Sequence, residues 1–251
     1  MRKTIDLNAD LGEGAGSDEQ MLGLVSSANI ACGLHAGNPA SILATIEVAK
    51  RLQVAIGAHP SLNDRVNFGR SEQGTSPDEV FALTTYQVGA MQALCRAARV
   101  KLRHVKPHGA LYHMAARERP LADAVARAIA GLDSGLILFG PPASALVEAG
   151  REKGLTVAME FFADRNYLPD GSLVPRSRSD ALLPDAKAAA ARALQMLREN
   201  RVRAVDGSDV ALSAETICVH GDTPQAVEFV RALRAELEGA GIAIRAPRSQ
   251  S

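Results

Sequence analysis

The chain has 251 residues, of which 47% are hydrophobic and 22% charged, with 28 basic and 28 acidic side chains. This length supplies enough apolar material for a sizeable core, and a formal charge of zero gives no electrostatic reason to expect nucleic acid or an anionic membrane as a partner. Aromatic residues make up only 4% and tryptophan is absent, so a platform for stacking nucleic-acid bases is not expected.

The cysteines and the first residues favour a reducing compartment. The three cysteines, Cys32, Cys95 and Cys218, are odd in number and form no CxxC pair, which argues against a disulfide framework or a zinc knuckle. Residues 1–6 lack the apolar region of a secretory signal, and no apolar run approaches the ~18 residues of a membrane span. We therefore expect a cytoplasmic protein.

Short apolar runs that predict strands alternate with longer segments that predict helices. The runs are nearly continuous, without strict alternation of polar and apolar residues, as in strands buried on both faces. Repeated strand–helix units on a chain of this length favour a parallel barrel or a doubly wound sheet. The predicted strands are 4–7, 28–31, 54–57, 104–106, 135–139, 156–159 and 216–219, with a weaker one at 242–244.

Three helix starts carry capping signals. Residues 76–79 (Ser-Pro-Asp-Glu) combine a capping box with proline at the first helical position, and Asn38-Pro39 and Thr223-Pro224 follow the same logic. Capping is a sufficient explanation for Asn38, and equally for Asp222, so neither is taken as part of a catalytic set.

Two polar stretches interrupt the alternation inside what we expect to be one domain, residues 1–251. Residues 61–75 read as a long loop, and 163–184 form a longer insertion with Asp-Gly at 170–171, which predicts a hairpin. A second Asp-Gly at 206–207 predicts another hairpin. Long loops in a compact domain are usually lids or binding loops.

Polar side chains follow almost every predicted strand at its carboxyl end. One histidine in such a place is more often a structural residue, but in a parallel barrel all these ends meet on one face, where catalytic groups assemble. Several converging ends therefore favour an active site. The candidates are Asn8, Asp10, Glu13, His35, His59, Lys106, His108, Glu160, Asp164, Arg165 and His220.

The familiar nucleotide and hydrolase motifs are missing. The stretch 12–17 resembles a dinucleotide-binding loop but has Ser17 where that fingerprint needs glycine, and the chain contains no GxxxxGK[ST], GxSxG or HExxH. The groups that remain are carboxylates, imidazoles and an ammonium. They suit acid–base chemistry on a carbonyl or amide, with or without a metal ion.

Six segments together resemble the LamB/YcsF family over nearly the whole chain. They are DLNADLGEG (6–14), SANIACGLHAG (27–37), GAHPS (57–61), VKPHGALY (105–112), FADR (162–165) and TICVHGDTP (216–224). The family comprises A subunits of prokaryotic ATP-dependent 5-oxoprolinases. The resemblance implies a seven-stranded β/α barrel of the glycoside hydrolase/deacetylase type. It also implies opening of the lactam of 5-oxo-L-proline to L-glutamate, with ATP hydrolysis and with B and C subunits as partners.

The chain departs from the family pattern in a few places. Leu34 and Asn38 stand where Phe and Asp are usual, Ser71 replaces an arginine in the loop 61–75, and Glu215 stands where Asp is common. Asn38 caps a helix as well as aspartate does. Ser71 removes a cation from a loop that is expected to cover the site.

The resemblance and the chemistry lead to an assignment of roles. Asp10 and His59 would orient and deprotonate the attacking water, and His35 would protonate the leaving nitrogen. Lys106 would stabilise negative charge, and Arg165 would pair with the substrate carboxylate. Asn8, Glu13, His108, Glu160, Asp164 and His220 are the further substrate-binding candidates.

Two other functions stay open at this point. A metal-dependent deacetylase or amidohydrolase would use Asp10, His35 and His59 as ligands for a divalent cation. A non-catalytic protein of the complex would hold the lactam while its partners do the chemistry. Because no nucleotide motif is present, we expect ATP to bind mainly on partner subunits, and a homo-oligomer remains open as well.

Overall fold

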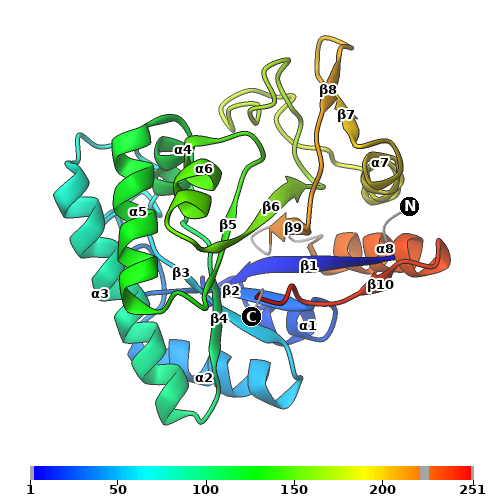
Figure 1. Ribbon diagram of the computed structural model, residues 1–251. Coiled ribbons are helices and arrows are strands. Elements are labelled where there is room, and N and C mark those ends of the chain that lie inside the picture. Colours follow the sequence, from blue (N-terminus) through cyan, green and yellow to red (C-terminus); the bar gives the residue numbers. More distant parts are fainter. Residues whose placement is uncertain (1–2, 221–225, 250–251) are drawn as a thin grey trace.

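Seven parallel strands close into a barrel at the centre of the molecule. The computed structural model describes residues 3–220 and 226–249. Around the barrel the strands run β1-β2-β3-β4-β5-β6-β9, and pairing of β1 with β9 closes the circle (Figure 1). Their bounds are β1 Thr4–Leu11, β2 Ser27–Ala31, β3 Ala55–His59, β4 Leu102–Val105, β5 Ile137–Gly140, β6 Thr156–Phe162 and β9 Thr216–His220. The predicted seven-stranded parallel barrel is confirmed.

Three short strands lie outside the barrel circle. β10 (Ala243–Ile244) pairs in parallel with the first residues of β1, and β7 (Arg201–Arg203) and β8 (Asp209–Ala211) form an antiparallel hairpin. The predicted hairpin around 170–171 is present as a bridge between Tyr167 and Leu173. The two hairpins contact each other, because the Val205 N–H donates to the Tyr167 carbonyl at 3.0 Å. They rise together above one end of the barrel (Figure 1).

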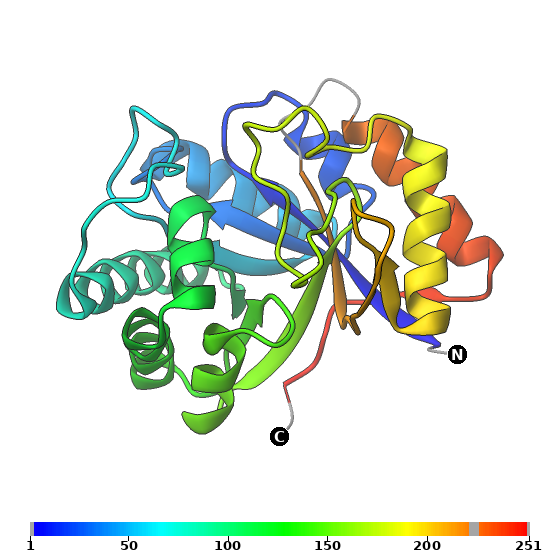
Figure 2. The ribbon, with the colours of Figure 1, turned by 90° about the horizontal axis from the view of Figure 1, so that it is seen from above.

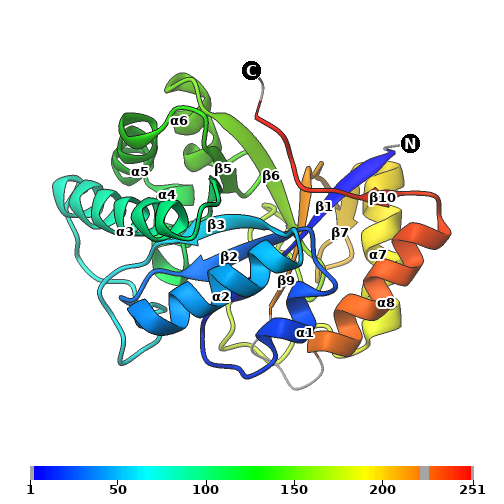
Figure 3. The same ribbon diagram turned by 90° about the horizontal axis from the view of Figure 1, so that it is seen from below.

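Eight helices occur in the described part of the chain. Seen along the barrel, α3 and α5 pack together on one side and α7 and α8 on the opposite side (Figures 2 and 3). The helices are α1 Asp18–Leu22, α2 Pro39–Arg51, α3 Pro77–Ala97, α4 Gly109–Arg117, α5 Arg119–Leu132, α6 Ala145–Glu152, α7 Ala186–Glu199 and α8 Ala226–Gly239. None of the described helices is long and apolar enough to cross a membrane.

Two predicted helix starts are confirmed with their caps. The Asn38 side chain accepts from the N–H groups of Ala40 and Ser41, both at 3.0 Å, and Ser76 and Glu79 form the capping box that opens α3. These bonds satisfy backbone donors that a helix leaves unpaired in its first turn. The third predicted start, at 223–224, and Asp222 lie outside the described residues.

The expected burial of the strands on both faces is confirmed, but β1 alternates between apolar and polar residues, which the description as a continuous apolar run missed. Ile5, Leu7, Ala9 and Leu11 are buried together in the main apolar cluster of the molecule. Asp6, Asn8 and Asp10 occupy the alternate positions and bond to polar side chains of other barrel strands. Because successive side chains of a strand point to opposite faces, β1 presents an apolar face to the helices and a polar face to the barrel interior.

Candidate functional site

Lys106 lies at the centre of the polar interior, one residue beyond the end of β4. Its ammonium is 3.0 Å from Asp10 Oδ1, 3.0 Å from Glu160 Oε1 and 3.0 Å from Cys218 Sγ. Only 2% of its surface is exposed. Burial lowers the pKa of Lys106, but the Asp10 and Glu160 carboxylates outweigh this effect and hold the pKa well above its ordinary value. Lys106 is therefore a fixed positive charge.

Two asparagines connect the residues around Lys106. Asn8 Nδ2 donates to Glu160 Oε1 at 3.0 Å, and Asn29 Nδ2 donates to Asn8 Oδ1 at 2.6 Å and to Asp10 Oδ1 at 2.9 Å. On the far side of the ammonium, the Tyr112 hydroxyl donates to Glu160 Oε2 at 2.9 Å. Each carboxylate is thus held by at least one neutral donor besides the lysine, which fixes the geometry of the charges.

A second polar cluster in the barrel interior is formed by the Asp6 carboxylate and three hydroxyl groups. Asp6 accepts from the hydroxyls of Ser26, Ser27 and Thr216 at 2.6–2.7 Å. Burial raises the pKa of Asp6 to about 6, although the three hydroxyl donors oppose the shift. Asp6 supports the site from beneath and was not singled out from the sequence.

The imidazoles of His59 and His108 meet above Asp10. His59 Nδ1 lies 2.6 Å from the Lys106 carbonyl, and His108 Nε2 lies 2.9 Å from the Phe68 carbonyl. Each carbonyl can only accept, so each of these nitrogens carries a proton. The two remaining nitrogens, His59 Nε2 and His108 Nδ1, face each other at 3.0 Å. Asp10 Oδ2 lies 3.4 Å from His59 Nε2.

The third imidazole, His35, stacks on His108 with ring centroids 3.8 Å apart. Its Nε2 donates to Glu13 Oε1 at 3.1 Å, whereas its buried Nδ1 has no hydrogen-bond partner among the described residues. Burial lowers the pKa of His35, and Glu13 only partly offsets this. Burial also lowers the pKa of His108, and the neighbouring His59 and His35 lower it further. Both rings are therefore favoured as neutral bases.

The loop 61–75 packs its backbone directly onto these rings. Gly69 has a φ of +67°, and a Cβ there would lie 2.9 Å from His108 Cδ2 and 3.0 Å from His35 Cβ. Only glycine allows this approach in this conformation. The carbonyl of Gly69 accepts from the Ala110 N–H at 2.9 Å, which ties the loop to the start of α4. The expected lid is thus already in contact with the site.

A cavity of about 690 Å³ opens beside the imidazoles. Glu13 and His35 reach it from the site, and Phe68 and Arg65 line it from the loop 61–75. The guanidinium of Arg65 donates to the carbonyls of Gly33 and Gly37. The cavity therefore borders the site at Glu13 and His35.

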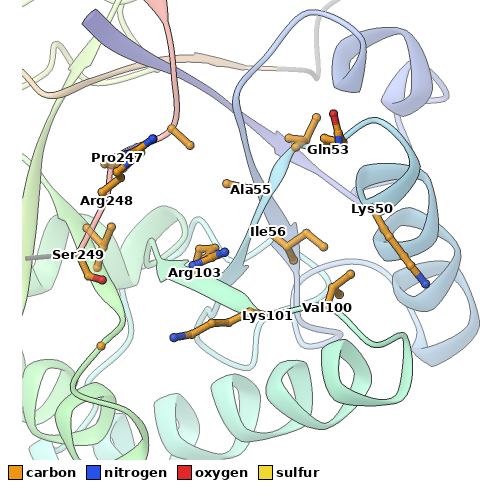
Figure 4. A pocket seen from close by; sticks show the side chains of 14 residues that line it. Lys50, Gln53, Ala55, Ile56, Val100, Lys101, Arg103, Pro247, Arg248 and Ser249 are labelled. Atoms are coloured by element: carbon orange, nitrogen blue, oxygen red, sulfur yellow. The ribbon is translucent and has the colours of Figure 1, made fainter. Parts of the chain in front are cut away.

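A second hollow, of about 650 Å³, lies at the opposite end of the barrel, where the strands begin (Figure 4). Lys50, Lys101, Arg103 and Arg248 give it a basic lining. Lys101 and Arg103 are exposed, and the Lys50 ammonium donates to the Ala98 carbonyl at 2.8 Å. It shares no residue with the cluster around Lys106.

The structure brings most of the predicted site residues together, with three exceptions. Arg165 donates to the carbonyls of Ala181 and Val174, at 3.4 and 2.5 Å, within the insertion 163–184, so these donors are engaged inside the loop. Asp164 is buried in the same insertion. His220 ends β9 beside Asp10 in the strand pairing, and its side chain lies outside the described part of the structure.

Besides Asp6, four residues of the interior were missed from the sequence: Asn29, His104, Thr216 and Cys218. Cys218 lies within an apolar run of the sequence, but its sulfur contacts Lys106. His104 Nε2 donates to Asn29 Oδ1 at 2.8 Å, and burial lowers the pKa of His104 to about 3. The sequence did contain a signal for these residues: polar side chains occur at every second position, as in Asp6-Asn8-Asp10 and in Thr216-Cys218. Residues two apart in a strand lie on the same face.

Two groups of donor atoms in the described structure are close enough to hold a metal ion: Asp10, His59 and His108, and Glu13, His35 and His108. The sequence favoured Asp10, His35 and His59 as ligands. In the structure His108 takes the place expected for His35 beside Asp10 and His59, because His108 meets His59 through its ring edge, whereas His35 stacks on the face of His108 and groups with Glu13.

Comparisons with known proteins agree with this architecture. The sequence profile of the LamB/YcsF family matches residues 5–251. A protein of Neisseria meningitidis, called the A subunit of 5-oxoprolinase, is 52% identical over 97% of this chain and 100% of its own length.

Two solved structures also share the fold. The crystal structure of a lactam utilization protein from Thermus thermophilus has a TM-score of 0.91 at 46% identity, covering 97% of this chain and 100% of that one. A family 4 carbohydrate esterase from Streptomyces lividans, at 10% identity, a TM-score of 0.50 and coverage of 99% and 97%, shares the fold alone.

Proposed function

Because the chain belongs to the LamB/YcsF family, we propose that it is the lactam-opening component of an ATP-dependent 5-oxoprolinase. It would convert 5-oxo-L-proline to L-glutamate together with B and C subunits in the cytoplasm, where ATP is available. The observation that carries this proposal is the buried Lys106 ammonium, held between Asp10 and Glu160 next to three imidazoles. The name of the Neisseria relative, the A subunit of 5-oxoprolinase, supports the choice of substrate.

Lys106 is suited to stabilise negative charge on the oxygen of the reacting carbonyl. Its three N–H groups already have three acceptors, Asp10, Glu160 and the Cys218 sulfur. Sulfur is the weakest acceptor of the three, so a substrate oxygen would take the place of that contact. The lysine would then bind the oxygen more strongly as charge develops on it, which is what lowers a barrier.

The remaining groups would handle water and protons. Asp10 and His59 would orient the attacking water. His35 would accept its proton on the unpartnered Nδ1 and pass it to the ring nitrogen as the lactam C–N bond breaks. This changes one assignment made from the sequence, where His59 was the base. Burial lowers the pKa of His35 and keeps its ring neutral, which leaves Nδ1 able to accept a proton.

ATP would supply the driving force, since a lactam is a resonance-stabilised amide and a five-membered ring tends to close again. Transfer of the γ-phosphoryl group to the amide oxygen releases ADP and makes the ring carbon electrophilic. Attack of water on that carbon then releases phosphate and opens the ring. We propose that partner subunits bind most of the nucleotide, because the chain carries no recognisable phosphate loop.

The test is glutamate release by the assembled complex. We expect Asp10→Asn and His35→Gln to lower kcat by at least about 100-fold, in line with the contribution of a general acid or base. The control is His113→Gln, on the exposed surface of α4. Retention of most activity in Asp10→Asn or His35→Gln would contradict these roles, and a complex that leaves 5-oxo-L-proline intact would contradict the function.

A metal-dependent amidohydrolase or deacetylase is the second candidate, favoured by the grouping of Asp10, His59 and His108. Such an enzyme would act without ATP and lose activity in EDTA. A lactam-binding protein without chemistry of its own is the third. In that case the Asp10→Asn and His35→Gln substitutions would raise KM and leave kcat unchanged.

A further inference from the structure

We propose that Asp10, His59 and His108, with Glu13 as a fourth donor, form a binding site for one divalent transition-metal ion. The donor atoms are Asp10 Oδ2, His59 Nε2, His108 Nδ1 and Glu13 Oε1. The inference concerns cation binding by this chain and does not rest on the proposed lactam reaction.

The first argument is the direction of the hydrogen bonds at the two rings. His59 Nδ1 donates to the Lys106 carbonyl and His108 Nε2 donates to the Phe68 carbonyl. In neutral rings this leaves a lone pair on His59 Nε2 and another on His108 Nδ1, and these atoms face each other at 3.0 Å. Two buried lone pairs at this distance repel each other unless a proton or a metal ion lies between them.

The second argument is the surrounding charge. The Asp10 carboxylate approaches His59 Nε2 at 3.4 Å, and the Glu13 carboxylate approaches His108 Nδ1 at 3.4 Å. Both side chains are 7% exposed, and Lys106 contacts Asp10 through the other oxygen, Oδ1. The gap between the rings is therefore bordered by two lone pairs and two carboxylates. These four groups would all attract a cation.

The third argument is the spacing of the donor atoms. Ligands placed ~2.0–2.1 Å from a tetrahedral ion lie about 3.3 Å from one another. The distances between the donors are 3.0 Å for His59 Nε2 to His108 Nδ1, and 3.4 Å for each of the two carboxylate contacts. The separation of His59 Nε2 and Glu13 Oε1 is 3.9 Å. These four distances bracket the spacing expected around one ion, and Glu13 also belongs to the adjoining group of donors with His35 and His108.

The donor chemistry selects the class of ion. Two imidazole nitrogens with carboxylate oxygens suit Zn²⁺, Co²⁺ or Mn²⁺, whereas Mg²⁺ and Ca²⁺ prefer oxygen alone. The Lys106 and Phe68 carbonyls orient the two ligand rings through their other nitrogens, as outer partners do in metal sites. Such an ion lowers the pKa of bound water and polarises a carbonyl.

The experiment is a titration of the full chain, freed of metal with a chelator, with Co²⁺ followed by visible absorption and with Zn²⁺ followed by calorimetry. We expect one equivalent to bind, and affinity to fall at least about 100-fold in Asp10→Asn and His108→Gln. His113→Gln, on exposed α4, is the matched histidine control and should bind like the unsubstituted chain. Far-UV circular dichroism checks that each variant folds.

A second measurement covers a variant that does not fold. In the ¹⁵N-histidine-labelled, unsubstituted chain, Zn²⁺ should shift His59 Nε2 and His108 Nδ1 and leave the ring nitrogens of His104 and His113 unchanged. Absence of saturable binding up to about 1 mM metal would overturn the proposal. In that case a proton would lie between His59 Nε2 and His108 Nδ1 instead of a metal ion. Binding that survives both Asp10→Asn and His108→Gln would overturn it too. A chain that binds Co²⁺ through these residues but assembles into a complex inactive on 5-oxo-L-proline would contradict only the proposed function.

Discussion

Lys106 and its two carboxylates form a buried charge cluster whose members depend on one another. Lys106→Met would leave Asp10 and Glu160 buried without their cation, so we expect a loss of roughly 3–5 kcal/mol in the free energy of unfolding. Adding Glu160→Gln should recover part of that loss, because it removes one unpaired charge. Urea unfolding of the two single variants and the double variant measures the coupling.

The activity of the same variants separates stability from chemistry. Neither Lys106→Met nor the double variant should release glutamate in the complex, since both lack the ammonium. An additive double variant in the unfolding experiment would contradict the proposed dependence, and glutamate release by either chain would contradict the role of Lys106.

Asp6 should make the stability of the protein depend on pH. Its folded-state pKa of about 6 lies above the ordinary value of 3.8. The folded state therefore binds the extra proton, so the contribution of Asp6 is fully present below the unfolded-state pKa and is lost as the pH rises through about 6. Relative to Asp6→Asn, the unsubstituted chain should lose roughly 2 kcal/mol of unfolding free energy between about pH 4.5 and pH 7.5. A constant difference over this range would contradict the prediction.

At the scale of single residues, the sequence predicted which side chains lie close together, but not the orientation of the imidazole rings or their hydrogen-bond partners. Asp10, His59, Lys106 and Glu160 converge because parallel strands bring their ends to one face. The relation between His59 and His108 depends on the Lys106 and Phe68 carbonyls, whose positions follow from the folded loop rather than from spacing. Arg165 shows the same limit, because loop carbonyls accept from its Nε and Nη2.

At the scale of elements, β3 and β4 can pair because Gly57 of β3 has no side chain, which leaves room for the His104 ring of β4. A Cβ on Gly57 would lie 2.0 Å from His104 Nε2, and the strand register shifts at this point. His104 cannot move aside, because it stacks on Phe139 with ring centroids 4.3 Å apart.

We therefore expect Gly57→Ala to cost about 3 kcal/mol or more of unfolding free energy. The control is Gly89→Ala in α3, where a Cβ meets nothing within 4 Å. That change should stabilise the chain by roughly 0.5–1 kcal/mol, because alanine favours helix over glycine. Thermal unfolding measures both variants, and equal melting temperatures would show that His104 can move after all.

The elements themselves were largely predictable, and the reason differs by type. Capping residues such as Asn38 and Ser76 mark helix starts through local hydrogen bonds, which the sequence contains in full. The strands and their burial on both faces were predicted, but the polar character of the face inside the barrel was overlooked. The alternation in residues 5–11 was nevertheless present in the sequence.

At the scale of the whole molecule, we expect activity to depend on partners. The isolated chain should open 5-oxo-L-proline very slowly, and addition of B and C subunits should raise the rate by several orders of magnitude. Activation of an amide can remove ~5 kcal/mol from a barrier, at ~1.4 kcal/mol per decade. Full ATP-coupled turnover by this chain alone would contradict the prediction.

The loop 61–75 offers a probe of where a partner docks. Val66 at its tip is 96% exposed. Val66→Asp should therefore weaken assembly of the complex while leaving the fold unchanged. Leu52→Asp, at the opposite end of the barrel just after α2, is the control. Size-exclusion chromatography with B and C subunits measures assembly, and equal assembly by both variants would exclude this loop as a docking surface.

The closure of the barrel by β1 and β9 joins residues that leave the ribosome far apart in time. β1 ends at Leu11, whereas its partner β9 begins only at Thr216. Until then β1 and β6 each present an unpaired edge, and Asn8, Asp6 and Lys106 lack their contacts with Thr216 and Cys218. The nascent chain thus carries most of the residues of the candidate site before it has the strand that encloses them, so synthesis of β9 determines when the site forms.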